Sequence, residues 1–181
     1  MTRFLALLRA VNVGGRKLPM AELRALCTDE LGWREVQTYI QSGNVVFETE
    51  GEAATLETSL ERAVETRFGF AAPAMIRTAS EWPALLARNP FLSEAEAEPS
   101  RVFLGIGKGA IAAGAAEKIA GRAAAGERVK EAGGALWFHY PQGAGTSKLT
   151  PALIDRAAGC PVTARNWRTA VTLGEMFGSG A

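Results

Sequence analysis

Three short polar loops hold the side chains best suited to binding chemistry. They are Arg9–Lys17 (RAVNVGGRK), Gln41–Asn44 within TYIQSGNVVF, and Tyr140–Lys148 (YPQGAGTSK). They combine cations with amides and hydroxyls, which can bind and orient a polar anion. We therefore expect a polar, weakly cationic cleft for a small anionic or nucleotide-like molecule. The candidate ligand-binding residues are Arg9, Asn12, Lys17, Gln41, Ser42, Asn44, Tyr140, Ser147, Lys148, Arg165 and Asn166.

Each of these roles has a structural alternative. Arg9 follows the apolar run Phe4–Leu8, so it either binds a ligand at a strand end or pairs with a helix carboxylate such as Glu22. The Asn, Gln and Ser side chains either orient a ligand or satisfy loop backbone. Lys148 either holds an anion together with loop amides or is simply solvated.

The segment GAGTSK resembles a phosphate loop only in part. A phosphate loop needs a hydroxyl residue directly after its lysine, whereas Ser147 precedes Lys148 here. Adjacent side chains also point apart, which argues against a serine–lysine nucleophile. We therefore expect neither a nucleoside triphosphatase nor a serine hydrolase of this type.

Other catalytic and metal chemistry lacks support in the residue pattern. The single histidine, His139, lies in an apolar strand and is expected to be packed or to face a turn. Cys27 and Cys160 are far apart, stand beside apolar residues, and are expected to be buried thiols. No metal-ligand spacing is present and no cofactor is indicated, so whether the protein is an enzyme stays open.

Charge and composition restrict the partners. The 181 residues include 20 Lys and Arg against 19 Asp and Glu, for a net charge of +1, which argues against duplex nucleic acid. Single-stranded nucleic-acid binding or a protein-interaction module is the alternative, and Tyr39 and Trp167 either stack on a ring or belong to the core. No apolar segment is long enough to span a membrane and no signal peptide is visible, so we expect a cytoplasmic protein; no oligomeric state is indicated.

Hydrophobic patterning predicts the first half. We expect strands at 4–8, 36–40, 44–48 and 74–77. Apolar residues at helical spacing predict helices at about 19–31 and 52–68, each closed by a glycine. The resulting order, β-α-β-β-α-β, is the ferredoxin-like pattern.

The same order is expected to repeat. Strands are predicted at 101–106, 127–131, 135–140 and 161–164, with helices at about 110–125 and 150–158. Gly133-Gly134 is a hairpin signal, and Asn166 can cap a last helix at 167–177. We expect an α+β fold in which two tandem ferredoxin-like halves, residues 1–92 and 101–181, pack as one compact unit. Extra helices include one near 80–87, and the acidic segment 93–100 is expected to be an exposed linker.

Five sequence blocks carry a family resemblance: ALLRAVNVGGRKLPMAELRAL, TYIQSGNVVF, RNPF, HYPQGAGTSKL and TARNWRT. Together they resemble domain-of-unknown-function family 1697, a group of bacterial proteins. The resemblance implies an α+β fold with a ferredoxin-like part and brings no established reaction. Its motif positions correspond to Arg9, Asn12, Gly14, Gln41, Ser42, Gly43, Asn44, Ser147, Lys148, Arg165, Asn166 and Trp167. One departure is Ala10-Val11, where Gly-Ile is expected, which removes some backbone freedom beside Arg9.

Overall fold

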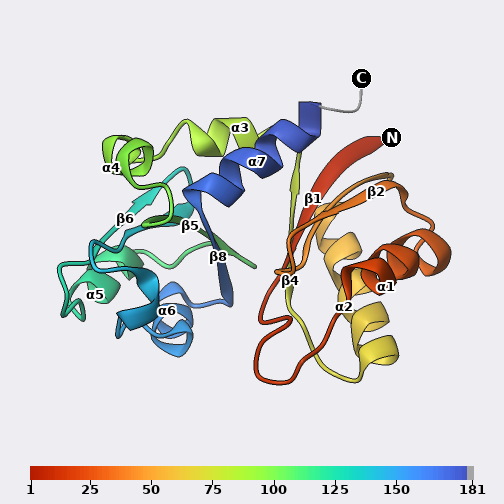
Figure 1. The fold of residues 1–181 in the computed structure, drawn as a ribbon, viewed down its shortest axis with the longest axis horizontal. Coiled ribbons are helices and arrows are strands. Elements are labelled where there is room, and N and C mark those ends of the chain that lie inside the picture. Colours follow the sequence, from red (N-terminus) through yellow and green to blue (C-terminus); the bar gives the residue numbers. More distant parts are fainter. Residues whose placement is uncertain (179–181) are drawn as a thin grey trace. The chain divides into compact units, whose positions relative to one another are not determined.

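The computed structural model describes residues 1–178, in which strands and helices alternate (Figure 1). The chain divides into two compact units. Unit 1 comprises Met1–Trp82 together with the chain from Leu173, and unit 2 comprises Pro83–Thr172. That the two halves pack as one compact unit stays a prediction.

Unit 1 contains a four-stranded antiparallel sheet of order β2-β3-β1-β4. Its elements are β1 (Thr2–Leu8), α1 (Met20–Ala25), β2 (Arg34–Tyr39), β3 (Asn44–Thr49), α2 (Ala53–Phe68) and β4 (Ala74–Thr78). Figure 1 shows α1 and α2 on the same face of this sheet. Phe4 and Leu8 of β1 belong to the core that includes Leu23 of α1 and Leu60 of α2.

Helix α1 is extended by an irregular turn. Residues Leu26–Glu30 form a π-helix, in which the Leu31 amide donates to the Leu26 carbonyl at 3.2 Å. Gly32 then stops the helix with φ of 67°. The wider turn shifts the helical period, and both Leu26 and Cys27 are fully buried.

The edge strand β4 is covered by carboxylates of α2. Glu61 Oε1 accepts the Ala74 amide at 2.8 Å, and Glu57 Oε1 accepts the Ile76 amide at 2.8 Å. Both amides would otherwise be unpaired donors on a sheet edge, where a second strand can add. The helix therefore protects this edge as well as filling the core.

Unit 2 contains a second antiparallel sheet, of order β6-β7-β5-β8. Its elements are α4 (Leu92–Ala97), β5 (Val102–Gly107), α5 (Ala115–Ala120), β6 (Arg128–Ala132), β7 (Ala135–His139), α6 (Pro151–Ala158) and β8 (Val162–Asn166). Gly133 and Gly134 join β6 to β7 with φ of 63° and 75°, which confirms the hairpin turn. The division between units falls within α3 (Glu81–Leu86) and within α7 (Trp167–Gly178).

Two segments differ from expectation. Helix α5 covers only Ala115–Ala120 of the expected 110–125. Gly114 before it is left-handed with φ of 76°, and the amides of Ala124 and Ala125 after it donate to the Glu127 carboxylate. The expected linker 93–100 contains most of α4 and lies inside unit 2.

Two of the three acidic residues of that segment form ion pairs, and the third, Glu96, is exposed. Glu94 pairs with Arg128, and Glu98 pairs with Arg101 at 2.7 Å. Ala95 between them is fully buried. Composition alone did not reveal these partners, since both arginines lie outside the acidic segment.

The carboxylate cover of β4 can be tested by mutation. Glu57→Ala leaves the buried Ile76 amide without an acceptor and should lower the free energy of unfolding by about 1.5–3 kcal/mol. Glu57→Gln keeps an acceptor and should cost less. The exposed Glu65, also on α2, provides the control, since Glu65→Ala should change stability by under about 0.5 kcal/mol in urea denaturation. Equal losses for Glu57→Ala and Glu65→Ala would contradict this role.

Candidate functional site

The Asn12 side chain joins two of the predicted loops. Its Nδ2 donates to the Gln41 carbonyl at 2.6 Å and to the Leu18 carbonyl at 3.0 Å. Its Oδ1 accepts the Leu18 amide at 2.8 Å. One amide group therefore closes the loop after β1 and attaches it to the turn before β3. We call residues 9–18 and 40–44 the loop pair.

The turn of the loop pair is built from its own polar side chains. Asn44 is fully buried, and its Nδ2 donates to the Tyr39 carbonyl and to Ser42 Oγ, both at 2.9 Å. Gly43 has φ of 76°, and its carbonyl accepts the Leu8 amide at 2.9 Å. A Cβ on Gly43 would lie 2.8 Å from Leu8 Cβ and from Val11 Cγ2. Packing and backbone geometry therefore require the Ser42-Gly43-Asn44 sequence, independently of any role in ligand binding.

Backbone strain is concentrated in the loop pair. Ala10, Asn12 and Ile40 adopt φ of 56°, 55° and 50°, and Glu35 is the other non-glycine residue with positive φ among residues 1–178. Left-handed conformations cost a residue with a Cβ about 1–2 kcal/mol and cluster at binding sites. The conformation of Ala10 explains why glycine suits that position.

Several side chains of the loop pair are exposed to solvent. Arg16 and Lys17 are exposed, and Arg9 is half-buried beyond the end of β1. Val13 and Ile40 are also exposed, at 56% and 50%. The loop pair contains no Asp or Glu. It therefore presents cations and apolar groups on a backbone that its own hydrogen bonds hold.

The third predicted loop lies in unit 2 and is tied to Glu127. Ser147 Oγ donates to Glu127 Oε1 at 2.6 Å, and this bond, together with the Ala125 and Ala124 amides, lowers the pKa of Glu127 to about 2. Tyr140 is buried and stacked on Phe138 at 5.8 Å, and burial raises the pKa of its hydroxyl. Ser147 and Tyr140 therefore have structural roles in this loop.

The remaining predicted residues of unit 2 differ in exposure. Lys148 is exposed. Arg165 is buried in β8, where it donates to Thr163 Oγ1 at 2.8 Å and to the Ala164 carbonyl at 3.0 Å. Burial lowers the pKa of the Arg165 guanidinium to about 10, so it keeps its charge at neutral pH. Asn166 Oδ1 accepts the Thr169 amide at 2.9 Å, which confirms it as the cap of α7.

The eleven candidate residues thus divide between the two units. Unit 1 holds Arg9, Asn12, Lys17, Gln41, Ser42 and Asn44 in the loop pair, and unit 2 holds Tyr140, Ser147, Lys148, Arg165 and Asn166. Of the two aromatic candidates, Trp167 is half-buried with its ring centre 6.1 Å from that of Trp137, and Tyr39 is half-buried in β2.

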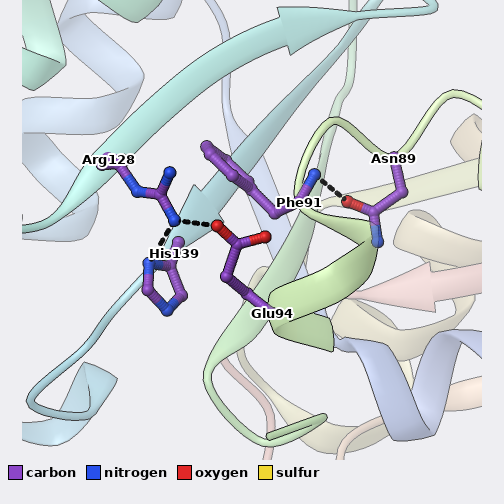
Figure 2. Close-up of polar contacts among 5 residues, drawn as sticks. All are labelled: Asn89, Phe91, Glu94, Arg128 and His139. Atoms are coloured by element: carbon purple, nitrogen blue, oxygen red, sulfur yellow. Dashed lines mark hydrogen bonds and ion pairs between the residues drawn. The ribbon is translucent and has the colours of Figure 1, made fainter. Parts of the chain in front are cut away.

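A polar cluster around Arg128 was not anticipated from the sequence (Figure 2). The Arg128 guanidinium pairs with Glu94, lies 3.2 Å from His139 Nδ1, and sits 4.9 Å from the centre of the Phe91 ring. Burial, followed by the positive charge of Arg128, lowers the pKa of His139. The geometry therefore favours a neutral histidine that accepts a hydrogen bond from Arg128.

The cysteines behave differently from one another. Cys27 is fully buried, and burial raises its pKa to about 12. Cys160 is half-buried rather than buried, with its Sγ 3.6 Å from the Gly109 carbonyl. Across residues 1–178, no three His, Cys, Asp or Glu side chains are grouped so as to hold a metal ion. No helix in the same range is long and apolar enough to cross a membrane.

Comparison with known proteins places the chain in a family without assigning it a reaction. The family model described as "Protein of unknown function (DUF1697)" matches residues 1–137. The chain is also similar to the conserved bacterial protein SP0830 from Streptococcus pneumoniae, with a TM-score of 0.71 and 23% identity over 97% of this chain and 98% of that chain. At this identity the likeness shows the fold. No curated protein matches the chain.

The packing demand on Gly43 predicts a measurable difference between two glycines. Gly43→Ala combines left-handed strain with overpacking and should lower the free energy of unfolding by about 2–4 kcal/mol. Gly69 ends α2 with φ of 78°, and a Cβ added there would have no heavy atom within 4 Å, so Gly69→Ala should cost only about 1 kcal/mol. Urea denaturation measures both variants. Equal losses would mean that the contacts with Leu8 and Val11 do not restrict the turn.

The Arg128 cluster predicts a pH dependence of stability. Because the folded pKa of His139 lies below 6.5, the unfolded chain takes up the proton first, and stability should fall as the pH drops below 6.5. His139 faces Arg128, Arg101, Glu94 and Glu98, so carboxylates also contribute to the total slope at lower pH. His139→Gln removes only the histidine component and keeps an acceptor. Denaturation between about pH 7 and pH 5 should show a shallower slope for this variant, and an unchanged slope would contradict a neutral His139.

Proposed function

Because the chain belongs to the DUF1697 family, which carries no assigned function, we propose from its own residues that it binds a small anionic or nucleotide-like molecule at the loop pair. The observation that carries this proposal is the set of hydrogen bonds by which the Asn12 side chain joins two loops. Neither loop contains Asp or Glu. A site prepared in this way loses little conformational entropy on binding.

Residues of the loop pair have two kinds of role in this proposal. Arg9, Arg16 and Lys17 supply positive charge to the anion. Asn12, Gln41, Ser42 and Asn44 act by holding the backbone, since the side chains of Asn12 and Asn44 and the Gln41 carbonyl are engaged in internal hydrogen bonds. Lys148 offers an exposed cation in unit 2, and its contribution is measured separately.

The proposed fold assignment for each unit is ferredoxin-like. Unit 1 has the element order β-α-β-β-α-β and the sheet order β2-β3-β1-β4, and unit 2 repeats both with β6-β7-β5-β8. This support is topological. Ferredoxin-like units serve many functions, so the assignment does not strengthen the ligand proposal.

A protein-interaction role is the second candidate. Val13 and Ile40 are two large apolar side chains exposed in the loop pair. Apolar groups at the centre of a contact surface, bordered by cations, are typical of protein–protein interfaces. An interaction role predicts that Val13→Ser and Ile40→Ser weaken partner binding while leaving small-anion binding unchanged.

The anion proposal is tested by thermal stabilisation with sulfate, phosphate and nucleotides. Ligand at about 100 times its dissociation constant should stabilise the protein by about 2.7 kcal/mol, which raises the melting temperature by several degrees. The double variant Arg16→Ala, Lys17→Ala should lose most of this shift. Arg62→Ala, an exposed change on α2, should retain it, and Lys148→Ala measures any contribution of unit 2.

Two results would contradict the proposal. The first is no stabilisation by any of these anions. The second is an equal shift in the double variant and in the wild-type protein. Tight oligonucleotide binding with a steep salt dependence, without small-anion binding, would instead favour the single-stranded nucleic-acid alternative.

A further inference from the structure

A basic groove runs between α5 and α6 in unit 2. Helices α5 and α6 lie side by side (Figure 1), and a cavity of about 550 Å³ lies against them. Three cations line it, namely Lys118, Arg122 and Arg156. Its apolar wall includes Ala152, Leu153 and Ala157. We call this cavity the α5–α6 groove.

The three cations of the groove are not neutralised by the protein. All three are exposed, and no ion pair within residues 1–178 joins any of them to a carboxylate. The acidic residues of the same helices do not line the groove. One of them, Asp155, accepts the Val162 amide at 3.0 Å instead. The groove therefore concentrates positive charge although the whole chain carries a net charge of only +1.

The first turn of α6 adds a backbone donor at the same place. Pro151 has no amide hydrogen, the Leu153 amide donates to Thr150 Oγ1 at 3.3 Å, and the Ile154 amide donates to the Thr150 carbonyl at 3.0 Å. The remaining amide of the first turn belongs to Ala152, which lines the groove, and neither of these two hydrogen bonds uses it. A helix amide and nearby cations favour the same charge on a ligand.

We propose that the α5–α6 groove binds a small molecule that carries a phosphate or pyrophosphate group. Two arginines match phosphate oxygens in pairs of hydrogen bonds, and the lysine adds a point charge. Three cations without carboxylates suit a ligand with at least two negative charges. The volume lies within the range of sites for nucleotide-sized molecules, and Leu153 and Ala157 can contact an organic group beyond the phosphate.

Repulsion among the three cations destabilises the protein without ligand. A surface with a purely structural role would avoid this cost. Lys118 of α5 and Arg122 in the turn after α5 line the same groove, where like charges repel. Removing them should leave the empty protein equally stable or make it more stable. Such a trade between stability and binding is characteristic of functional sites.

Isothermal titration of the full chain with inorganic pyrophosphate tests the groove. The double variant Arg122→Ala, Arg156→Ala should raise the dissociation constant by about 100-fold, since each charged contact contributes about tenfold. The matched control is Arg62→Ala, Arg168→Ala, which removes the same charge from exposed positions outside the groove and should change binding by less than about threefold. Arg156→Lys keeps the charge but loses the paired hydrogen-bond geometry, so its dissociation constant for pyrophosphate should lie between those of the groove variant and the control variant.

The outcomes separate this site from the loop pair. Loss of pyrophosphate binding in the groove variant alone supports the proposal. Equal weakening in the groove and control variants, no binding by the wild-type protein, or loss only in Arg16→Ala, Lys17→Ala would overturn it. Binding of a single-stranded oligonucleotide but not of pyrophosphate would also overturn it. Melting curves check folding, and a groove variant with an unchanged or raised melting temperature isolates the binding effect.

Discussion

The hydrogen bonds of the Asn12 side chain determine the form of the surface for which we propose ligand binding. A single amide closes one loop on itself and fixes it to a second loop that is distant in sequence. Asn12 itself has φ of 55°, a conformation that asparagine tolerates better than most residues. The side-chain hydrogen bonds of Asn12 and its tolerance of positive φ therefore both hold the loop in this conformation. The strained neighbours Ala10 and Ile40 are maintained because these bonds restrain the backbone around them.

The distribution of carboxylates explains how a nearly neutral chain can present two cationic surfaces. Glu57 and Glu61 satisfy amides of β4, while Glu127 accepts Ser147 and two loop amides. Another carboxylate, Glu94, pairs with Arg128 beside His139. Each of these four acids has its partner outside the loop pair and the α5–α6 groove. The loop pair contains no Asp or Glu and none lines the groove, which the net charge does not reveal.

Much of the fold could be predicted because local signals agreed with the tertiary structure. Residues with one strong conformational preference were the most informative, as for the Gly133-Gly134 turn, the Asn166 cap and the glycine that closes α2. Predictions were less successful where composition was the only guide. The alanine-rich stretch after β5 is mostly not helical, and its last amides donate to the nearby Glu127 carboxylate. The acidic segment 93–100 is mostly helical, and its Glu94 pairs with the distant Arg128.

The candidate site was predicted less well than the fold, for a related reason. Motif residues such as Ser42, Asn44 and Ser147 were candidates for ligand contact, but their side chains complete turns and loops. Sequence spacing cannot distinguish a hydroxyl that binds a ligand from one that accepts an internal hydrogen bond. The α5–α6 groove gave no motif, because its cations come from α5, the turn after it and α6, and they form a cluster only after these helices pack.

Hydrogen–deuterium exchange of Asn12→Gly tests most directly whether this side chain holds the loop pair. Glycine accepts φ of 55°, so the substitution removes the hydrogen bonds without adding backbone strain. Exchange should accelerate at the Leu18 amide and across residues 9–18 and 40–44, while amides in the centre of β1 and β3 keep their wild-type protection. Unchanged exchange in both loops would show that other contacts hold them and would contradict the role given to Asn12.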